Sequence, residues 1–260
     1  MTDFNNKEIA VSITKSLFSA VPYVGQLLNE IAFDYRGRIK QNRLNKFTDH
    51  LAEFFQTANE INIENLKTEE FSDLFESVLK RVTQTKSEEK QKRFRDILIN
   101  QFQNPNHNID NSETYLDLVT TLSEPEIQIL KNHQIFDENY DVKETQLTEA
   151  QNKLLQKKER LEKEHNLSAK GYANNYLKVE HEIKELQSIV NLLTQDIKQL
   201  QVFRTPSFYN ISKNDFLYYK QSLCSKALLI DNGIGAISVR PFEVMGITEF
   251  GKKFIQYIIK

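Results

Sequence analysis

Apolar residues recur at alternating three- and four-residue steps near the middle of the second half of the chain. The positions in this series are Tyr176, Val179, Ile183, Leu186, Val190, Leu193, Ile197 and Leu200. An unbroken a/d pattern of this kind is typical of a coiled coil, because it keeps one apolar stripe facing a partner helix. We therefore predict a long helix whose buried seam is formed by these eight positions.

A weaker heptad pattern precedes this seam. The apolar positions in phase are Leu147, Ala150, Leu154 and Leu161. Lys157 occupies the seam position that interrupts them. Between the two patterns the stretch HNLSAKG contains Gly171, which offers a place for the chain to turn. We expect an antiparallel hairpin over residues 141–203 with its tip at 166–171, and parallel dimerisation through the second arm alone stays open as an alternative.

The part of the chain before the hairpin shows the periodicity of amphipathic helices. Apolar stripes with helical spacing run through residues 9–20, 27–55, 71–82, 94–102 and 115–122. Thr68 is placed to cap the third stripe, and Ser123 with Glu126 forms a capping box before a further helix. This pattern predicts a compact all-α bundle.

The C-terminal part combines helical and strand-like patterns. Ser212 is placed to begin a helix, and the DNG triplet at 231–233 supplies turn chemistry to end it. Two segments rich in β-branched residues, 234–239 and 242–247, indicate short strands, and Thr248 is placed to cap a last helix. Helix, two-stranded wing and helix together resemble half of a winged-helix domain.

Composition agrees with a mainly helical protein. Charged residues make up 27% of the chain and hydrophobic residues 39%, with only 7 Gly and 5 Pro. Long helices with solvated faces have this composition. We predict a mainly α fold: a helical bundle over 1–140, an inserted antiparallel coiled-coil hairpin over 141–203, and a small winged-helix-like domain over 204–260.

Charge and cysteine content narrow the class of protein further. With 34 Lys and Arg against 36 Asp and Glu the net charge is −2, so the chain as a whole does not attract nucleic acid. One cysteine, Cys224, suits a reducing cytosol, and we interpret it as a core residue. Since the first residues lack a secretory layout, we expect a cytoplasmic protein, with contact to the inner membrane as an alternative.

Patterns for catalysis and metal binding are missing from the sequence. The histidines are His50, His107, His133, His165 and His181, and none has a second ligand at metal-binding spacing. No phosphate loop, nucleophile elbow or H-E-x-x-H pattern occurs. Acidic pairs at 69–70 and 88–89 fall in predicted first turns of helices, where they complement the helix dipole. We expect no enzymatic activity, no catalytic residue, no metal and no cofactor.

A cluster of cations follows the most apolar stretch of the chain. It consists of Arg36, Arg38, Lys40, Arg43 and Lys46, and we call it the basic cluster. Three interpretations compete: a solvated helix face, an anchor on an anionic membrane surface, and a sequence-independent contact with phosphates. We favour the solvated face, then the membrane, then nucleic acid.

The stretch before this cluster, residues 16–29, carries no charge. A membrane-spanning helix needs about 20 apolar residues, and Pro22 and Gly25 interrupt this shorter stretch. We expect the part from Ser16 to Leu28 to pack inside the protein. A membrane-active effector that inserts these residues after a trigger is the main alternative function.

The predicted C-terminal domain carries an excess of cations, which suits phosphate contact. Its candidate recognition helix, 214–230, offers the polar contacts Lys220, Gln221, Ser222, Ser225 and Lys226. These residue types provide few partners for base edges. We therefore expect the domain to serve packing or protein contact, and a DNA-binding regulator is the weaker alternative.

Three segments in this order resemble a known family. They are KSEEKQKRFRDILINQF, then TYLDLVTTLSEPEIQILKNH, then LCSKALLIDNG followed by VMGITEFGKKFIQYI. The order is similar to that of the Abi-alpha family of bacterial proteins, with Thr248, Gly251 and Phe254 matching the family's terminal T-x-x-G-x-x-F pattern. The hairpin over 141–203 is a departure from that family. The resemblance implies a context, abortive infection as a defence against phage, and no chemistry.

From these observations we expect a non-enzymatic interaction protein of phage defence. Its partner is expected to be a protein, or a second copy bound through the coiled coil, with peripheral membrane contact as a further possibility. Sequence-specific binding to nucleic acid is not expected.

Overall fold

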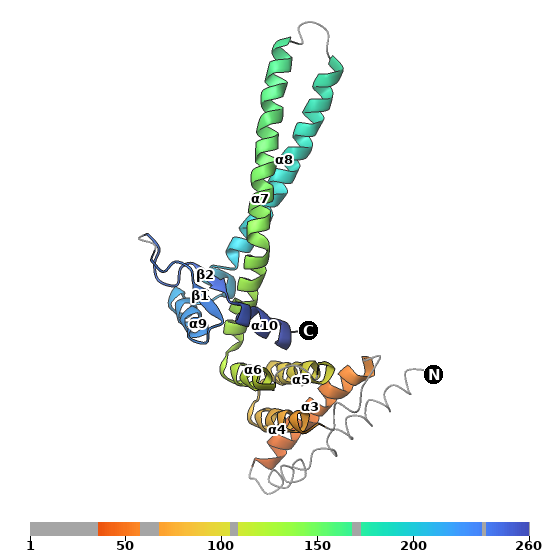
Figure 1. The fold of residues 1–260 in the computed structure, drawn as a ribbon, viewed down its shortest axis with the longest axis vertical. Coiled ribbons are helices and arrows are strands. Elements are labelled where there is room, and N and C mark those ends of the chain that lie inside the picture. The colour runs from red at the N-terminus through yellow and green to blue at the C-terminus, as the bar shows by residue number, and fades with distance from the viewer. Residues whose placement is uncertain (1–35, 58–67, 105–108, 168–172, 236–237, 260) are drawn as a thin grey trace, which may run out of the picture. The chain divides into compact units, whose positions relative to one another are not determined.

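The computed structural model describes residues 36–57, 68–104, 109–167, 173–235 and 238–259. It is mainly helical with one antiparallel pair of short strands, which confirms the predicted fold class (Figure 1). The chain forms two compact units, one of residues 1–123 with 253–260 and the other of residues 124–252. The apolar stretch at 16–29 lies outside the described residues.

The first unit is a helical bundle. Its elements are α3 (Gly37–Thr57), α4 (Glu69–Gln84), α5 (Glu88–Gln103), α6 (Ile109–Thr121) and the second half of α10 (Glu249–Ile258). Thr68 caps α4 as predicted, because its hydroxyl accepts a hydrogen bond from the amide of Phe71 at 3.2 Å. Ser87 caps α5 in the same way, with its hydroxyl 3.3 Å from the amide of Lys90.

Buried aromatic and aliphatic side chains from every helix form the core of this unit. Its fully buried members include Phe47, Leu51, Leu74, Phe75, Val78, Val82, Ile97, Leu116, Val119 and Phe254. Polar contacts of Tyr257 also bind α10 to this bundle. The carbonyl of Tyr257 accepts a hydrogen bond from Asn100 at 2.6 Å, and the phenol of Tyr257 lies 3.0 Å from the hydroxyl of Ser112.

The second unit is built on two long helices. Its elements are α7 (Glu124–Leu167), α8 (Ala173–Val202), the short 3-10 helix η3 (Pro206–Tyr209), α9 (Lys213–Ser225), β1 (Leu229–Asp231), β2 (Met245–Ile247) and the start of α10. The boundary placed at residue 140 falls inside α7. No Gly or Pro interrupts the chain there, so one helix continues from Glu124 into the hairpin.

Helix α9 ends earlier than the DNG triplet predicted. After Ser225 the amide of Ala227 donates to the carbonyl of Cys224 at 2.9 Å, and the amide of Leu228 donates to the carbonyl of Leu223 at 3.0 Å. These two bonds form a Schellman motif, with Ala227 in the left-handed conformation at φ 57°. Glycine usually marks this position, so an alanine gave no signal. Cys224 is partly exposed and is not the core residue that we expected.

The first strand also lies elsewhere than predicted, whereas β2 falls within the predicted second segment, 242–247. Leu229 pairs with Ile247, and Asp231 pairs with Met245, so the first strand begins where a helix was expected. Ile234, placed in the predicted first strand, is 81% exposed in the connection between the strands. The carboxylate of Asp231 closes this connection by accepting hydrogen bonds from the amides of Gly233 and Phe242, at 2.9 and 2.7 Å.

The three residues that carry the family resemblance have separate structural roles. The hydroxyl of Thr248 caps α10 by accepting from the amide of Gly251 at 2.9 Å, and donates to the carbonyl of Ala227 at 2.7 Å. Gly251 lies against the backbone of Leu228, where an added Cβ would come within 2.4 Å of the carbonyl oxygen. Phe254 is fully buried.

Replacing Gly251 with Ala should therefore destabilise the protein by about 1–3 kcal/mol, because the new methyl group would force α10 away from Leu228. Urea denaturation measures this change. The exposed Lys253 of the same helix provides a control, since Lys253→Ala should leave the free energy of unfolding within about 0.5 kcal/mol. Equal stabilities of the two variants would contradict the close approach.

Candidate functional site

Helices α7 and α8 lie side by side and run in opposite directions, forming a hairpin (Figure 1). Its apolar centre consists of Ala150, Leu154 and Val190, with Leu147, Ile183, Leu186 and Leu193 packed against them. Val179, Ile197 and Leu200 continue the buried stripe, each less than a tenth exposed. The predicted seam residues of α8 from Val179 to Leu200 are therefore buried or partly buried in the hairpin. The side chain of Tyr176 lies outside the described part.

Two ion pairs flank the apolar centre. Lys143 of α7 donates to Asp196 of α8 at 2.5 Å, and Lys157 donates to Glu182 at 2.5 Å. The hydrogen bond from Lys157 lowers the pKa of Glu182. Lys143 and Lys157 are two heptads apart, and Glu182 and Asp196 are also two heptads apart. One antiparallel alignment of the helices therefore forms both pairs. Lys157, which interrupts the heptad pattern of the first arm, thus helps to set the register.

Leu186→Asp should destabilise the protein by about 3–5 kcal/mol, because it places a charge without a partner in the seam. Leu192 of the same helix is the matched control, since its side chain is 60% exposed and Leu192→Asp should cost about 0.5 kcal/mol or less. Thermal and urea unfolding of both variants measure the difference. Variants of equal stability would show that α8 does not bury the seam in solution.

An ion pair at the base of the hairpin connects the hairpin to β2. Arg204, just after α8, donates to the carboxylate of Asp137 on α7 at 2.6 Å. The same arginine donates to the carbonyl of Met245 at 2.5 Å, and the other oxygen of Asp137 accepts from the amide of Ile247 at 2.7 Å. The pair thus satisfies one acceptor and one donor on the outer edge of β2. It takes the place that a third strand would have in a larger sheet.

Aromatic and cationic side chains surround this pair. The guanidinium of Arg204 lies 3.9 Å from the centre of the Phe136 ring, a cation–π geometry. Lys220 of α9 is 8% exposed and donates to the carbonyl of Phe242, whose φ of 63° is left-handed. Burial lowers the pKa of both Arg204 and Lys220, and Asp137 partly offsets this effect at Arg204.

His133 lies one helical turn before Asp137 and is 2% exposed. Both of its ring nitrogens are buried without a hydrogen-bond partner, as is Nε of Arg204. We call His133, Phe136, Asp137, Arg204 and Lys220 the junction cluster. The sequence pointed to none of these five as a site, except Lys220 as a polar contact of the candidate recognition helix. Lys220 is instead buried and bound to backbone.

A double-mutant cycle should show that Asp137 and Arg204 act together. Asp137→Asn and Arg204→Met should each destabilise the protein by about 1–3 kcal/mol, because each leaves a partly buried charge without its partner. The double variant should cost less than the two single changes added, with a coupling of about 1–3 kcal/mol in urea denaturation.

The exposed pair Lys184 and Glu180 on α8, at 3.0 Å, gives a control cycle with little coupling. Strict additivity at Asp137 and Arg204 would show that the two residues stabilise the unit independently.

The structure divides the basic cluster on α3. Arg43 donates to the carbonyl of Thr83 at 2.6 Å, in the last turn of α4, and Lys46 lies 3.6 Å from Glu88 at the start of α5. Both cations therefore bind neighbouring helices within the unit. Arg36 and Arg38 are exposed at the start of α3. Contact of the cluster with an anionic surface stays a prediction.

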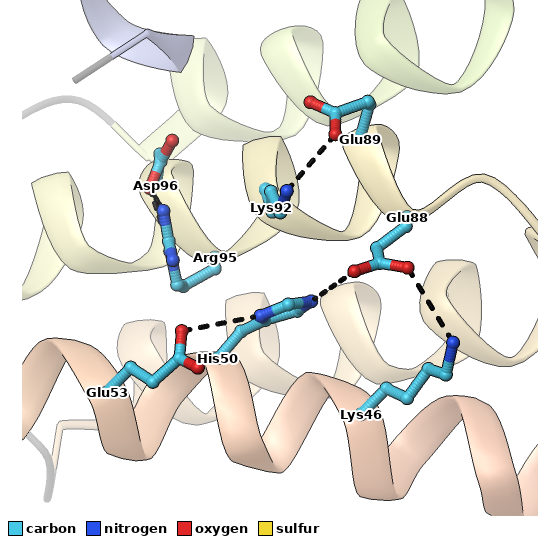
Figure 2. Close-up of polar contacts among 8 residues, drawn as sticks. All are labelled: Lys46, His50, Glu53, Glu88, Glu89, Lys92, Arg95 and Asp96. Atoms are coloured by element: carbon cyan, nitrogen blue, oxygen red, sulfur yellow. Dashed lines mark hydrogen bonds and ion pairs between the residues drawn. The ribbon is translucent and has the colours of Figure 1, made fainter.

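Glu88 also approaches a histidine that sequence analysis left unassigned. Figure 2 shows the imidazole of His50 between Glu53 of α3 and Glu88 of α5. Nδ1 lies 3.7 Å from Glu53, and Nε2 lies 3.8 Å from Glu88. Since opposite ring nitrogens face the two carboxylates, the three side chains cannot hold one metal ion together. They form a polar link between α3 and α5, beside the pairs Lys92–Glu89 and Arg95–Asp96.

Across the described ranges no group of His, Cys, Asp or Glu side chains is arranged to hold a metal ion. Of the helices described, none is long and apolar enough to cross a membrane. No family model, curated protein or solved structure matches the chain.

Proposed function

We propose that the chain is a non-enzymatic interaction protein and that the α7–α8 hairpin is the arm with which it contacts a protein partner. Two apolar side chains on the outside of α8 carry this proposal. Ile189 and Leu192 are 47% and 60% exposed, and residues three apart lie next to each other on a helix. They lie outside the seam and form a small apolar surface on the arm.

The packing of the α8 seam against α7 supports the proposal that the outer face of α8 is the contact surface. The apolar stripe of α8 packs against α7, so self-association through the seam would require the hairpin to open. The ion pairs at Lys143 and Lys157 hold the two helices in one register. A preorganised surface loses less conformational entropy when it binds, which favours recognition by the outer face.

The resemblance to Abi-alpha proteins supplies the proposed context, phage defence. A bacterial strain that expresses the full chain should lower the plaque count of at least one phage in a broad panel, relative to empty vector. The double variant Ile189→Lys/Leu192→Lys should lose about tenfold or more of this protection, as expected when central interface residues are changed.

Ser188→Lys/Gln195→Lys is the matched control, because it adds the same charge at exposed polar positions of α8. It should protect as the unchanged chain does. Circular dichroism and thermal melts should show that both variants keep the fold. Absence of protection by the unchanged chain against every phage would contradict the defence context. Full protection by the Ile189/Leu192 variant would contradict the role of this surface.

A further inference from the structure

The junction cluster contains a buried histidine with an unusual environment. His133 is almost fully buried, and neither ring nitrogen has a hydrogen-bond partner. Buried polar atoms are nearly always paired, because an unpaired one loses its bonds to water without replacement. The imidazole is therefore tolerated here only in its neutral form, whose burial costs far less than that of a cation.

Positive charges reach His133 from two further segments. Arg204 follows α8, and Lys220 projects from α9, and both oppose a third positive charge on the imidazole. Burial is the largest cause and these two cations add to it, so that the pKa of His133 falls from its usual 6.5 to about 3.

The acidic and phenolic groups of the surrounding elements are bound to other donors. On α7 itself, Asp137 accepts from Arg204 and Ile247, and Glu126 accepts from Ser222 at 2.5 Å. On β1, Asp231 accepts from two backbone amides.

On η3, the hydroxyl of Tyr209 donates to the carbonyl of Phe203 and accepts from Asn132. Burial raises the pKa of this phenol to about 12, so it stays neutral.

We propose that the junction cluster is an acid-sensitive latch, in which protonation of His133 releases the segment carrying Arg204, α9 and the two strands from α7. Opening exposes the imidazole to water, where it takes up a proton, and the protonated ring cannot return between Arg204 and Lys220. The described part of the seam contains no buried histidine and stays closed.

The direction of the pH dependence follows from linkage. The folded pKa is about 3 and the unfolded value is 6.5, so between these values the open state binds more protons than the closed state. The contribution of neutral His133 is fully present above pH 6.5 and is lost as the pH falls toward 3. Between pH 7 and 5 the opening equilibrium should rise about 25-fold.

Hydrogen exchange of the full chain tests the latch at single amides. The amide of Ile247, which donates to Asp137, reports on the junction, and the amide of Val190 reports on the seam. After correction for the intrinsic exchange rate, the protection of Ile247 should fall about 25-fold between pH 7 and 5, while that of Val190 should not change. His133→Leu should abolish the fall at Ile247, and His181→Gln, at an exposed position of α8, should retain it.

NMR titration of the imidazole in the unchanged protein gives a second measurement, which does not depend on the folding of a variant. The ring of His133 should stay neutral in the folded protein at pH 5. A ring that titrates near 6.5 in the folded state would overturn the proposal. An unaltered pH dependence of Ile247 in His133→Leu would also overturn it.

Discussion

The packing of the strands against the base of the hairpin depends on the ion pair between Asp137 and Arg204. A two-stranded ribbon is barely stable on its own, and its outer edge presents backbone groups that require partners. In this protein the carboxylate and the guanidinium serve the amide of Ile247 and the carbonyl of Met245, while they neutralise each other. The backbone bonds also satisfy the two charges, which offsets the cost of removing them from water. One set of contacts therefore holds together β2, α7 and the segment that follows α8.

The Asp137–Arg204 pair also helps to set the alignment of α7 with α8. Oppositely charged pairs link α7 with α8 or its end, among them Lys157–Glu182 toward the tip, Lys143–Asp196 below it, and Asp137–Arg204 at the base. The acid lies on α8 in the first two pairs and on α7 in the third. Sliding either helix by one heptad would bring Lys143 or Lys157 to the level of Ile189 instead of a carboxylate. The charges thus oppose the shifts that an apolar seam alone would permit, since its heptads resemble one another.

Periodicity and caps predicted the long elements well, because their signals are local. The seam spacing, Thr68 before α4 and Ser212 before α9 each operate within one or two turns of the chain. The end of α9 was missed because Ala227 takes the position of the expected glycine, and strands of three residues are too short for an alternating pattern. The junction cluster could not be predicted, since Asp137 and Arg204 are 67 residues apart in the sequence. Arg43 gave the appearance of a free cation for the same reason, with its acceptor 40 residues away.

Stability within the second unit is distributed unevenly, and the chemistry of its two halves explains why. The seam buries aliphatic side chains and places its ion pairs at partly exposed positions, where their charges keep contact with water. The junction instead buries the ring of His133 and the Nε atom of Arg204, and these three nitrogens lack partners. Such nitrogens regain hydrogen bonds when water enters, so opening is favoured where they lie and not along the seam. An arm used for recognition would then keep its shape while its base opens, because α7 belongs to both parts and the seam does not depend on the strands.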